Sequence, residues 1–334
     1  MRALQVLETP VQRAEKVSTA LGCEVWIKRD DLTHATYGGN KVRKLARLLE
    51  QARTLGATDI VTIGAVGSHH VFATILYGHA VGIDVHGVMV AQPHTPHVEQ
   101  MARADLAQGG TLIPARAAWE VPVIVAREAL RLRVSGRRPM VIPMGGSTPT
   151  GAMGYVDGVR ELSSQIARGD MPGWPDVIVA ALGSGGTVAG IVVGTRMERV
   201  PTRVVGVQVT ERWMPPPPVV RWMANATQTL ATQEGLPDAH NVHADDFDID
   251  LDQLGAGYGH PTPAAREAQA LFAQDGIVLD LTYTAKAAAG LIAMARRDTR
   301  PRRYLYWHTL SSAPMEPLLH GAPDLPPAIR ALMR

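Results

Sequence analysis

Short apolar runs that alternate with helix-length stretches constrain the fold of this chain more than any other feature. The first series consists of DIVTIGA, DVHGVMV, TLIPA and PMVIP, at residues 59–65, 84–90, 111–115 and 139–143. The stretches between them, such as VPVIVAREALRLRV, place apolar residues at three- and four-residue spacings. Strands that alternate with helices predict βαβ units and a parallel sheet, so we expect an α/β fold.

A second series of apolar runs begins at residue 176 and predicts a second parallel sheet. The stretch at 145–153, rich in Gly, Pro and Thr, is interpreted as the connection between the two series. Residues 211–225 contain four consecutive prolines, which predict a loop or a stiff crossing segment. The runs of the second series are DVIVAALG, TRVVGVQVT, GIVLDLTYT and RRYLYWHT, at residues 176–183, 202–210, 276–284 and 302–309.

Composition favours a globular protein that binds small molecules. The 334 residues are 46% apolar, and 33 basic against 31 acidic residues leave a net charge of +2, with no basic block for nucleic acid or an anionic membrane. The uncharged stretch 177–194 has the length of a membrane span, but the glycines around Ser184 favour a strand, a loop and a helix. The single cysteine and an N-terminal stretch without the apolar region of a signal peptide predict a cytoplasmic protein.

The stretch LGSGGTVAG, residues 182–190, is a candidate phosphate site. A strand that ends in a Gly-rich loop and runs into a helix presents free backbone N–H groups and the positive end of the helix dipole. Nucleotide-binding loops have a lysine after the last glycine or an acidic residue at the end of the next strand. Here no lysine follows the last glycine, and the next strand-like run ends in GVQVT, residues 206–210, with a neutral side chain. We therefore expect a phosphate without a nucleoside, with a purely structural turn as the alternative.

The stretch GGNKVRKL, residues 38–45, places Lys41 and Lys44 in the first turn of a predicted helix. Gly38 and Gly39 permit close approach of the backbone, and Asn40 can cap the helix. Cations at a helix N-terminus are disfavoured by the macrodipole, and a nearby anion would relieve that cost. Lys41 is thus either a solvated helix lysine or a reactive amine held by its loop.

Six motifs in register decide between these alternatives. They are IKRDDLTHATYGGNKVRKL, SHHVFAT, IPMGGSTPTGAMGYV, LGSGGTVAG, GYGHPTP and LDLTYTAKAAAGLI. Over almost its whole length the chain resembles the pyridoxal-phosphate enzymes that comprise D-cysteine desulfhydrase and 1-aminocyclopropane-1-carboxylate deaminase. The resemblance implies a tryptophan synthase β-like fold and a homodimer. It also implies a large cofactor domain of residues 1–45 and 150–334, with a smaller α/β domain of residues 46–149 inserted.

The resemblance also implies how pyridoxal 5'-phosphate is held. Lys41 matches the family lysine that carries the cofactor as a Schiff base, and Thr284 matches the partner of the pyridine nitrogen. His69 stands where the family usually has an asparagine that contacts the cofactor or the substrate. The further residues expected to bind the cofactor are Asn40, Lys44, Ser184, Gly185, Gly186 and Thr187.

The remaining matches concern a small amino-acid substrate. Ser68 matches a serine that faces the substrate, although a helix N-cap is an equally good interpretation of it. Tyr258 and Tyr283 match active-site tyrosines that could exchange protons if their pKa values were lowered, with packing at strand ends as the alternative. The expected catalytic residues are Lys41, Ser68, Tyr258 and Tyr283, and the expected substrate-binding residues are Ser68, His69, His70 and Thr309.

No metal is expected, because the adjacent His69 and His70 do not share a helix face. Thr284 and Thr309 match the desulfhydrases, whereas the deaminases have glutamate and leucine at these positions. We therefore predict a lyase that deprotonates Cα and eliminates a β-substituent, with D-cysteine as the first candidate substrate. The alternatives are cyclopropane ring opening, a lyase or racemase for another β-substituted amino acid, a phosphate-binding protein, and a nicotinamide-dependent reductase.

Overall fold

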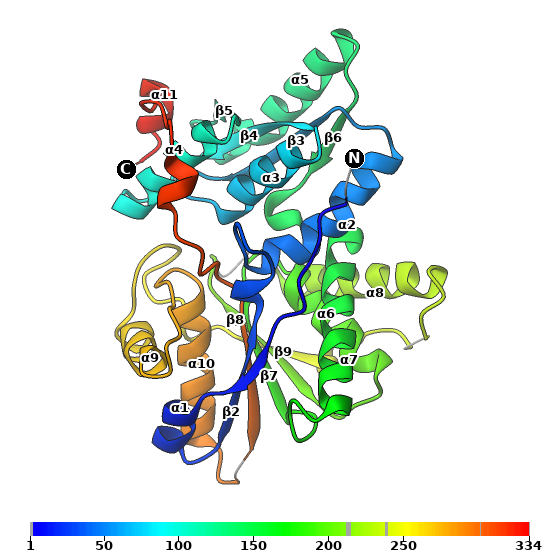
Figure 1. Cartoon of the computed structure of the whole chain (residues 1–334), viewed down its shortest axis with the longest axis vertical. Helices are drawn as coiled ribbons and strands as arrows, with labels where there is room; N and C mark the ends of the chain where they lie inside the picture. The colour runs from blue at the N-terminus through cyan, green and yellow to red at the C-terminus, as the bar shows by residue number, and fades with distance from the viewer. Residues whose placement is uncertain (1–2, 212–214, 238–239, 301, 334) are drawn as a thin grey trace. The chain divides into compact units, whose positions relative to one another are not determined.

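The computed structural model describes residues 3–211, 215–237, 240–300 and 302–333. The chain divides into two compact units, each with its own sheet (Figure 1). The larger unit consists of Val6–Arg43 and Ser147–Ser312. The smaller unit consists of Lys44–Gly146, the N-terminal residues through Gln5 and the C-terminal residues from Ala313. The helix α2, Asn40–Thr54, begins in the larger unit and continues into the smaller one.

The larger unit is built on a six-stranded sheet with the order β1-β2-β10-β7-β8-β9. Only β1 is antiparallel to its neighbour, and the other pairs are parallel. All six residues of β7 are buried, as a strand covered on both faces requires. The strands are β1 Val11–Arg13, β2 Glu24–Arg29, β7 Val177–Leu182, β8 Arg203–Gln208, β9 Phe247–Asp250 and β10 Arg303–His308.

Helices cover both faces of this sheet, as Figure 1 shows within the unit. Along β10, Leu305 and Trp307 point to one core and Tyr304 and Tyr306 to the other, because side chains alternate across a strand. The first core is closed by α6 Pro149–Arg168, α7 Gly186–Met197 and α8 Pro217–Gln233. The second is closed by α1 Glu15–Leu21, α9 Pro263–Ala273 and α10 Thr284–Arg297. Single 3₁₀ turns lie at Asp30–Leu32 and Ala244–Asp246.

The smaller unit holds a parallel four-stranded sheet with the order β5-β4-β3-β6. Val61 and Val88 pack against α5 on one face, and Gly64 and Gly87 approach Val71 of α3 on the other. The strands are β3 Asp59–Ala65, β4 Asp84–Val90, β5 Thr111–Pro114 and β6 Pro139–Ile142. The helices are α3 His69–Ala80, α4 Pro96–Ala107, α5 Val121–Val134 and α11 Pro327–Arg330, with 3₁₀ turns at Ala118–Glu120, Met144–Gly146 and Glu316–Leu319.

The α/β class and the two mainly parallel sheets are confirmed, and four details differ from prediction. Residues 276–283 form irregular structure and turns that lead into α10, not a strand, and the strand β9 was not predicted. The connection at 145–153 already contains the first residues of α6. In the proline-rich stretch, residues 212–214 lie outside the described part of the chain, and Pro217 begins α8, because proline is tolerated at the first helical position.

The C-terminal segment, red in Figure 1, differs from the predicted domain boundaries. The prediction placed residues 150–334 together, whereas the residues from Ala313 belong to the smaller unit. The Gln108 side chain donates a hydrogen bond of 2.9 Å to the Leu318 carbonyl, and Gln92 and Met333 form a parallel β-bridge. These contacts attach the C-terminal segment to the end of α4 and to the residues that follow β4.

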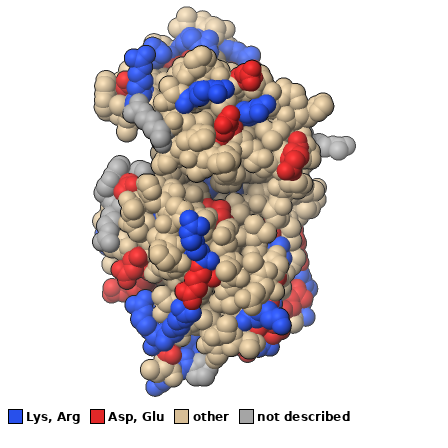
Figure 2. Space-filling model, turned by 90° about the vertical axis from the view of Figure 1, so that its left-hand side faces the viewer, with Lys and Arg blue, Asp and Glu red and all other residues tan. Residues whose placement is uncertain are grey.

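The uncharged stretch 177–194 forms a strand, a loop and a helix, as expected. Within the described residues, no helix has both the length and the apolar character that a membrane crossing requires. On the face drawn in Figure 2, basic and acidic side chains lie interspersed. That distribution agrees with the near-zero net charge of the sequence.

Candidate active site

The predicted phosphate loop joins the end of β7 to the start of α7 in the larger unit. Gly185 adopts a φ of +92°, a left-handed conformation that favours glycine. Ser147 supports the loop: its hydroxyl lies 2.7 Å from the Ser184 hydroxyl and accepts a hydrogen bond of 3.1 Å from the Gly186 amide. Hydroxyl groups and backbone amides therefore gather at the positive end of a twelve-residue helix, which is an arrangement that binds anions.

The two glycines of the GGNK stretch lie too close to their neighbours to be replaced by a residue with a side chain. A Cβ atom on Gly38 would lie 2.0 Å from the Asp31 carbonyl oxygen, and Gly39 has a φ of +91°. The Asn40 amide donates a hydrogen bond of 3.1 Å to the Thr309 carbonyl. The Gly38 amide donates to the Ser311 hydroxyl at 3.0 Å. The start of α2 is thereby tied to the segment that follows β10.

Asn40 joins the lysine to the phosphate loop. Its side-chain nitrogen donates a hydrogen bond of 3.2 Å to the Thr187 hydroxyl. Its side-chain oxygen accepts a hydrogen bond of 2.8 Å from the Lys41 amine. The side-chain amide of Asn40 thus contacts both the Lys41 amine and the first turn of α7, although Asn40 and Thr187 are 147 positions apart in the sequence.

The Lys41 amine is shifted toward its neutral form. Burial lowers the pKa of Lys41 to about 8, and the negative charge of Asp280 opposes that shift. An ordinary lysine, with a pKa of about 10.4, is almost entirely protonated at neutral pH. A neutral amine is the form that acts as a nucleophile or as a base, so Lys41 is suited to both tasks.

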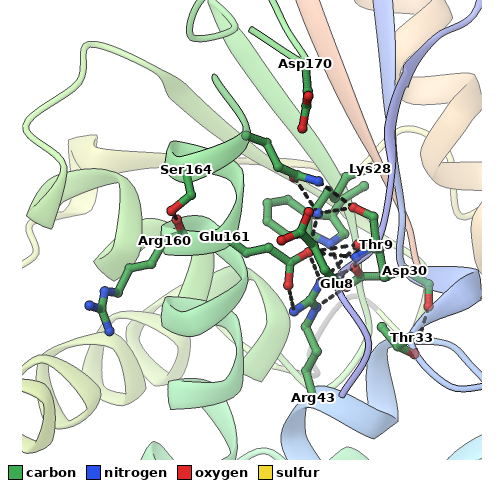
Figure 3. A network of polar contacts seen from close by, with 12 residues as sticks. Glu8, Thr9, Lys28, Asp30, Thr33, Arg43, Arg160, Glu161, Ser164 and Asp170 are labelled. Atoms are coloured by element: carbon green, nitrogen blue, oxygen red, sulfur yellow. Dashed lines mark hydrogen bonds and ion pairs between the residues drawn. The ribbon is translucent and has the colours of Figure 1, made fainter. Parts of the chain in front are cut away.

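A buried ionic network, drawn in Figure 3, anchors the first turn of α2. Arg43 donates to both carboxylate oxygens of Asp30 at 2.9 and 2.8 Å, and to Glu161 of α6 at 2.9 Å. Tyr155 and Trp307 also donate to Asp30, at 3.0 and 2.7 Å. The network fixes the backbone two residues beyond Lys41.

Charge compensation keeps the network ionised. Lys28, whose side chain is fully buried, forms an ion pair with Glu161. Burial alone raises the pKa of Glu161, but hydrogen bonds and charge from Arg43 and Lys28 lower it to about 2. Burial lowers the pKa of Lys28, and the charges of Asp30 and Glu161 oppose that shift. The sequence assigned no role to these residues, because the partners Arg43 and Glu161 are 118 residues apart.

Tyr258 and Tyr283 lie together, and their hydroxyl groups form a hydrogen bond. The rings meet edge to face, with centroids 5.6 Å apart. Burial raises the pKa of Tyr258 to about 12 and raises that of Tyr283 well above its usual value. Proton exchange by these tyrosines would have required lowered pKa values, and both pKa values are raised instead. Both phenols are therefore protonated at neutral pH and can serve as hydrogen-bond donors.

Asp280 was missed by sequence reasoning. Its carboxylate accepts hydrogen bonds from the backbone amides of Tyr283 and Thr284, at 2.7 and 3.0 Å, and so orders the first turn of α10. It also accepts the Thr284 hydroxyl at 2.6 Å. Thr284 is buried, and its one hydroxyl proton is engaged by Asp280. An Asp just before a helix is typical of an N-terminal cap, but the segment 276–284 was predicted as a strand, so Asp280 was not interpreted as a cap.

His308, at the end of β10, is the second missed residue. Burial lowers the pKa of its imidazole to about 4, so the ring is neutral at physiological pH. Its Nδ1 is buried and has no hydrogen-bond partner among the described residues. Thr309 follows it with little exposed surface and contributes its carbonyl to the Asn40 amide. Near the Lys41 loop, His308 Nδ1 is thus a buried ring nitrogen whose hydrogen-bonding capacity is not satisfied by the described residues.

The remaining predicted residues belong to the smaller unit. Ser68 caps α3 by accepting a hydrogen bond of 3.4 Å from the Val71 amide, as its structural interpretation predicted. His70 is buried and lies 2.9 Å from the Thr62 hydroxyl, which donates to the Ile142 carbonyl, so His70 Nε2 is the donor.

Lys44 and His69 complete this set. The Lys44 amine is buried and donates to the Gly145 carbonyl at 3.1 Å. His69 opens α3, and its imidazole faces that of His97. The roles that the sequence assigned to Lys44, Ser68, His69 and His70 toward a cofactor and a substrate stay predictions.

Comparison with known proteins places this geometry in context. A family model described as "Pyridoxal-phosphate dependent enzyme" matches residues 3–309. A Pyrococcus abyssi protein named "Putative 1-aminocyclopropane-1-carboxylate deaminase" is 32% identical over 304 residues, which cover 90% of this chain and 88% of that protein. The D-cysteine desulfhydrase of Salmonella paratyphi C is 35% identical over 294 residues, which cover 85% of each chain.

Solved structures agree with these sequence matches. The crystal structure of an ACC deaminase homologue superposes with a TM-score of 0.81 at 32% identity and covers 93% of this chain and 91% of that one. Threonine deaminase isoform 2 from Solanum lycopersicum gives a TM-score of 0.62 at 16% identity, covering 98% and 83%, which shows the fold alone.

The residues present fit pyridoxal phosphate by their chemistry. The cofactor needs an amine that is neutral in part at physiological pH and a separate site for a phosphate. Lys41 offers the first and the start of α7 offers the second. The Asn40 amide connects the two.

Proposed function

Because the chain belongs to the family of pyridoxal-phosphate dependent enzymes, we propose that it is a lyase that eliminates the β-substituent of a small amino acid, with D-cysteine as its substrate. This proposal rests on one observation: the side-chain amide of Asn40 contacts both the Lys41 amine and the Thr187 hydroxyl. D-cysteine and one water would give sulfide, ammonia and pyruvate, so the reaction balances without an oxidant or a reductant.

Lys41 is the residue that moves the Cα proton. When bound, pyridoxal phosphate supplies the electron sink that stabilises negative charge at Cα. The Lys41 amine accepts the proton in its neutral form, which its lowered pKa makes available. Asn40 orients this amine through the hydrogen bond to its side-chain oxygen.

Tyr258 and Tyr283 are the proposed hydrogen-bond donors to the leaving group. Both pKa values are raised by burial, so each phenol keeps its proton at neutral pH. The pair can therefore stabilise the negative charge that develops on the departing sulfur by hydrogen bonding. Asp280 orients Tyr283 by accepting its backbone amide.

Several cofactor contacts belong to the same proposal. Ser184, Gly185, Gly186 and Thr187 would hold the phosphate at the start of α7, and the resemblance assigns Lys44 to the same phosphate. Thr284 would be the partner of the pyridine nitrogen, and its neutral side chain would make the ring a weaker electron sink than a carboxylate partner would. The resemblance assigns Ser68, His69, His70 and Thr309 to the substrate, and the positive end of α3, which Ser68 caps, would attract a carboxylate.

Cyclopropane ring opening is the second candidate, favoured by the names of the Pyrococcus relative and of the structural homologue. Thr284 and Thr309 argue against it, because the deaminases that this sequence resembles have glutamate and leucine there. The two activities are distinguishable by their products. The deaminase would give 2-oxobutanoate and ammonia, and no sulfide.

The test is a comparison of substrates with the holoenzyme. We expect sulfide and pyruvate in equal amounts from D-cysteine, and no 2-oxobutanoate from 1-aminocyclopropane-1-carboxylate. The Lys41→Ala variant should lose sulfide release, whereas Lys16→Ala, at an exposed lysine, should keep it. Turnover of the cyclopropane substrate alone would replace the first candidate by the second, and sulfide release by Lys41→Ala would contradict both.

Assembly and location are part of the proposal. The resemblance implies a homodimer, and the composition of the sequence predicts a cytoplasmic protein that acts without nucleic acid or membrane. Size-exclusion chromatography with light scattering tests the assembly. We expect twice the mass of the chain, and the mass of a single chain would contradict the homodimer.

A further inference from the structure

Two histidines of the smaller unit face each other with their ring nitrogens. The Nε2 atoms of His69 and His97 are 3.4 Å apart, and the ring centroids are 5.1 Å apart with the planes tilted by 34°. His69 is the first residue of α3, and His97 is the second residue of α4. His97 is exposed and His69 is partly exposed, so solvent reaches the pair.

The separation of the nitrogens is that of two ligands on one metal ion. At 3.4 Å the two nitrogens are within reach of a weak hydrogen bond, beyond the usual span of about 2.7–3.2 Å, so the distance alone fits either a hydrogen bond or a shared ion. With metal–nitrogen bonds of about 2.0–2.1 Å and tetrahedral geometry, two imidazole nitrogens on one zinc ion stand about 3.3–3.4 Å apart.

The ring centroids give an independent check. Two imidazoles that share one tetrahedral ion, each lying along its metal–nitrogen bond, would have centroids about 5.2 Å apart. Two rings joined by a straight hydrogen bond would have them farther apart than the observed 5.1 Å, because the rings would then point directly at each other. The rings converge at an angle, as ligands of a common ion do.

We propose that His69 and His97 bind one divalent transition-metal ion of the zinc, nickel and copper class through their Nε2 atoms. Imidazole is a preferred ligand of these metals, whereas Mg²⁺ and Ca²⁺ prefer oxygen. The described residues contain no group of three or more His, Cys, Asp or Glu side chains that could hold a metal. Water therefore completes the coordination, and the ion is exchangeable, unlike a structural zinc.

Two effects set the strength of binding. The positive ends of α3 and α4 oppose a cation and lower the affinity. Neutral imidazoles are required as ligands, so protons compete with the metal and binding weakens as the pH falls. Neither effect changes the geometry of the two nitrogens.

Occupancy would also affect the proposed enzyme. His69 follows Ser68, which caps α3, and a metal bridge would fix the starts of α3 and α4 to each other. We expect the bound ion to inhibit turnover, and this consequence alone rests on the proposed function. Metal binding is measured without substrate. A failure of the proposed metal site is therefore distinguishable from a failure of the proposed lyase function.

The experiment is isothermal titration of the holoenzyme with Zn²⁺, without substrate, in the unchanged protein, in His97→Gln and in His94→Gln. His94 is a matched control, because it is an exposed histidine three residues away that pairs with Glu99. We expect one saturable site in the unchanged protein, at least tenfold weaker binding in His97→Gln, and an unchanged affinity in His94→Gln. Equal affinities in all three proteins, or no saturable site in the unchanged one, would overturn the proposal.

A spectroscopic measurement keeps the test decisive if His97→Gln folds poorly. Electron paramagnetic resonance of the unchanged holoenzyme with one equivalent of Cu²⁺ reports the nitrogens bound to the ion. We expect hyperfine coupling to two imidazole nitrogens. Coupling to one nitrogen or to none would equally overturn the shared site.

Discussion

Lys41 has the most consequential environment of any single residue, because its neutral fraction changes steeply with pH. With a pKa of about 8, that fraction rises from about one tenth at pH 7 to about nine tenths at pH 9. Attachment of pyridoxal phosphate to the apoprotein requires the neutral amine. We expect the rate of reconstitution to rise about tenfold over this range with a midpoint near pH 8, as followed by visible absorbance.

The same measurement on Lys16→Ala should give the same profile, because Lys16 is an exposed lysine in α1. A rate that keeps rising to pH 10 would mean that the attacking amine has the pKa of an ordinary lysine. That result would contradict the environment described for Lys41.

Asp105 of α4 supplies a second prediction at this scale. Its side chain is fully buried, neither carboxylate oxygen has a hydrogen-bond partner among the described residues, and burial raises its pKa well above the usual range. The folded state therefore keeps a proton that the unfolded state releases above about pH 4. The contribution of this proton to the free energy of unfolding is fully present below that pH and is lost as the pH rises toward the pKa of the folded state.

Asp105→Asn removes this titration. Relative to the unchanged protein it should gain about 1.4 kcal/mol of unfolding free energy per pH unit above about pH 5, until the folded pKa is reached. Urea unfolding at pH 5, 6 and 7 measures the gain, with Asp324→Asn at an exposed position as the control. A difference that stays constant with pH would show that Asp105 is ionised in the folded protein.

At the scale of elements, α7 packs against α6 through Gly190. A Cβ atom at Gly190 would lie 2.2 Å from the Ala152 carbonyl oxygen and 2.5 Å from Tyr155 Cβ. Alanine is favoured over glycine in a helix by about 1 kcal/mol, but overpacking costs about 1–3 kcal/mol. The difference leaves a net destabilisation of up to about 2 kcal/mol, which we expect for Gly190→Ala in urea unfolding.

Ser164→Ala, on the exposed side of α6, is the control and should change stability by less than about 0.5 kcal/mol. A Gly190→Ala variant that is more stable than the unchanged protein would mean that α6 and α7 separate at little cost.

The network beneath α2 allows a test by double mutation. Arg43→Met leaves the Asp30 carboxylate buried without its charge partner, at a cost of about 3–5 kcal/mol. Adding Asp30→Asn removes the unpaired charge, so the double variant should recover part of the loss. Urea unfolding of the two single variants and the double variant measures the coupling, and costs that simply add would contradict the pairing.

Sequence patterns predicted those elements whose residues alternate in polarity or are apolar throughout. The buried runs of β3, β4, β7 and β10 were recognised for that reason. GIVLDLTYT has the same composition, but Asp280 bonds the following backbone amides and turns the chain into α10. The strand β9, FDID, carries two acidic residues and resembles a loop.

For the whole molecule, local motifs predicted the two-sheet α/β class and the membership of the family, because six of them occur in register along the chain. Contacts between distant segments left no local signal. The attachment of the residues from Ala313 to the smaller unit is one example, and the pairing of Arg43 with Glu161 is another. The link from Lys41 through Asn40 to Thr187 likewise depends on the folded chain.

The central claim is that Lys41 is the residue that holds the cofactor. Borohydride reduction of the holoenzyme, followed by peptide mass mapping, tests it most directly. We predict the mass of reduced cofactor on Lys41 and on no other lysine, in the unchanged protein and in Lys16→Ala, and none in Lys41→Ala. Cofactor fixed on a different lysine, or none fixed on the yellow unchanged protein, would contradict the site described here.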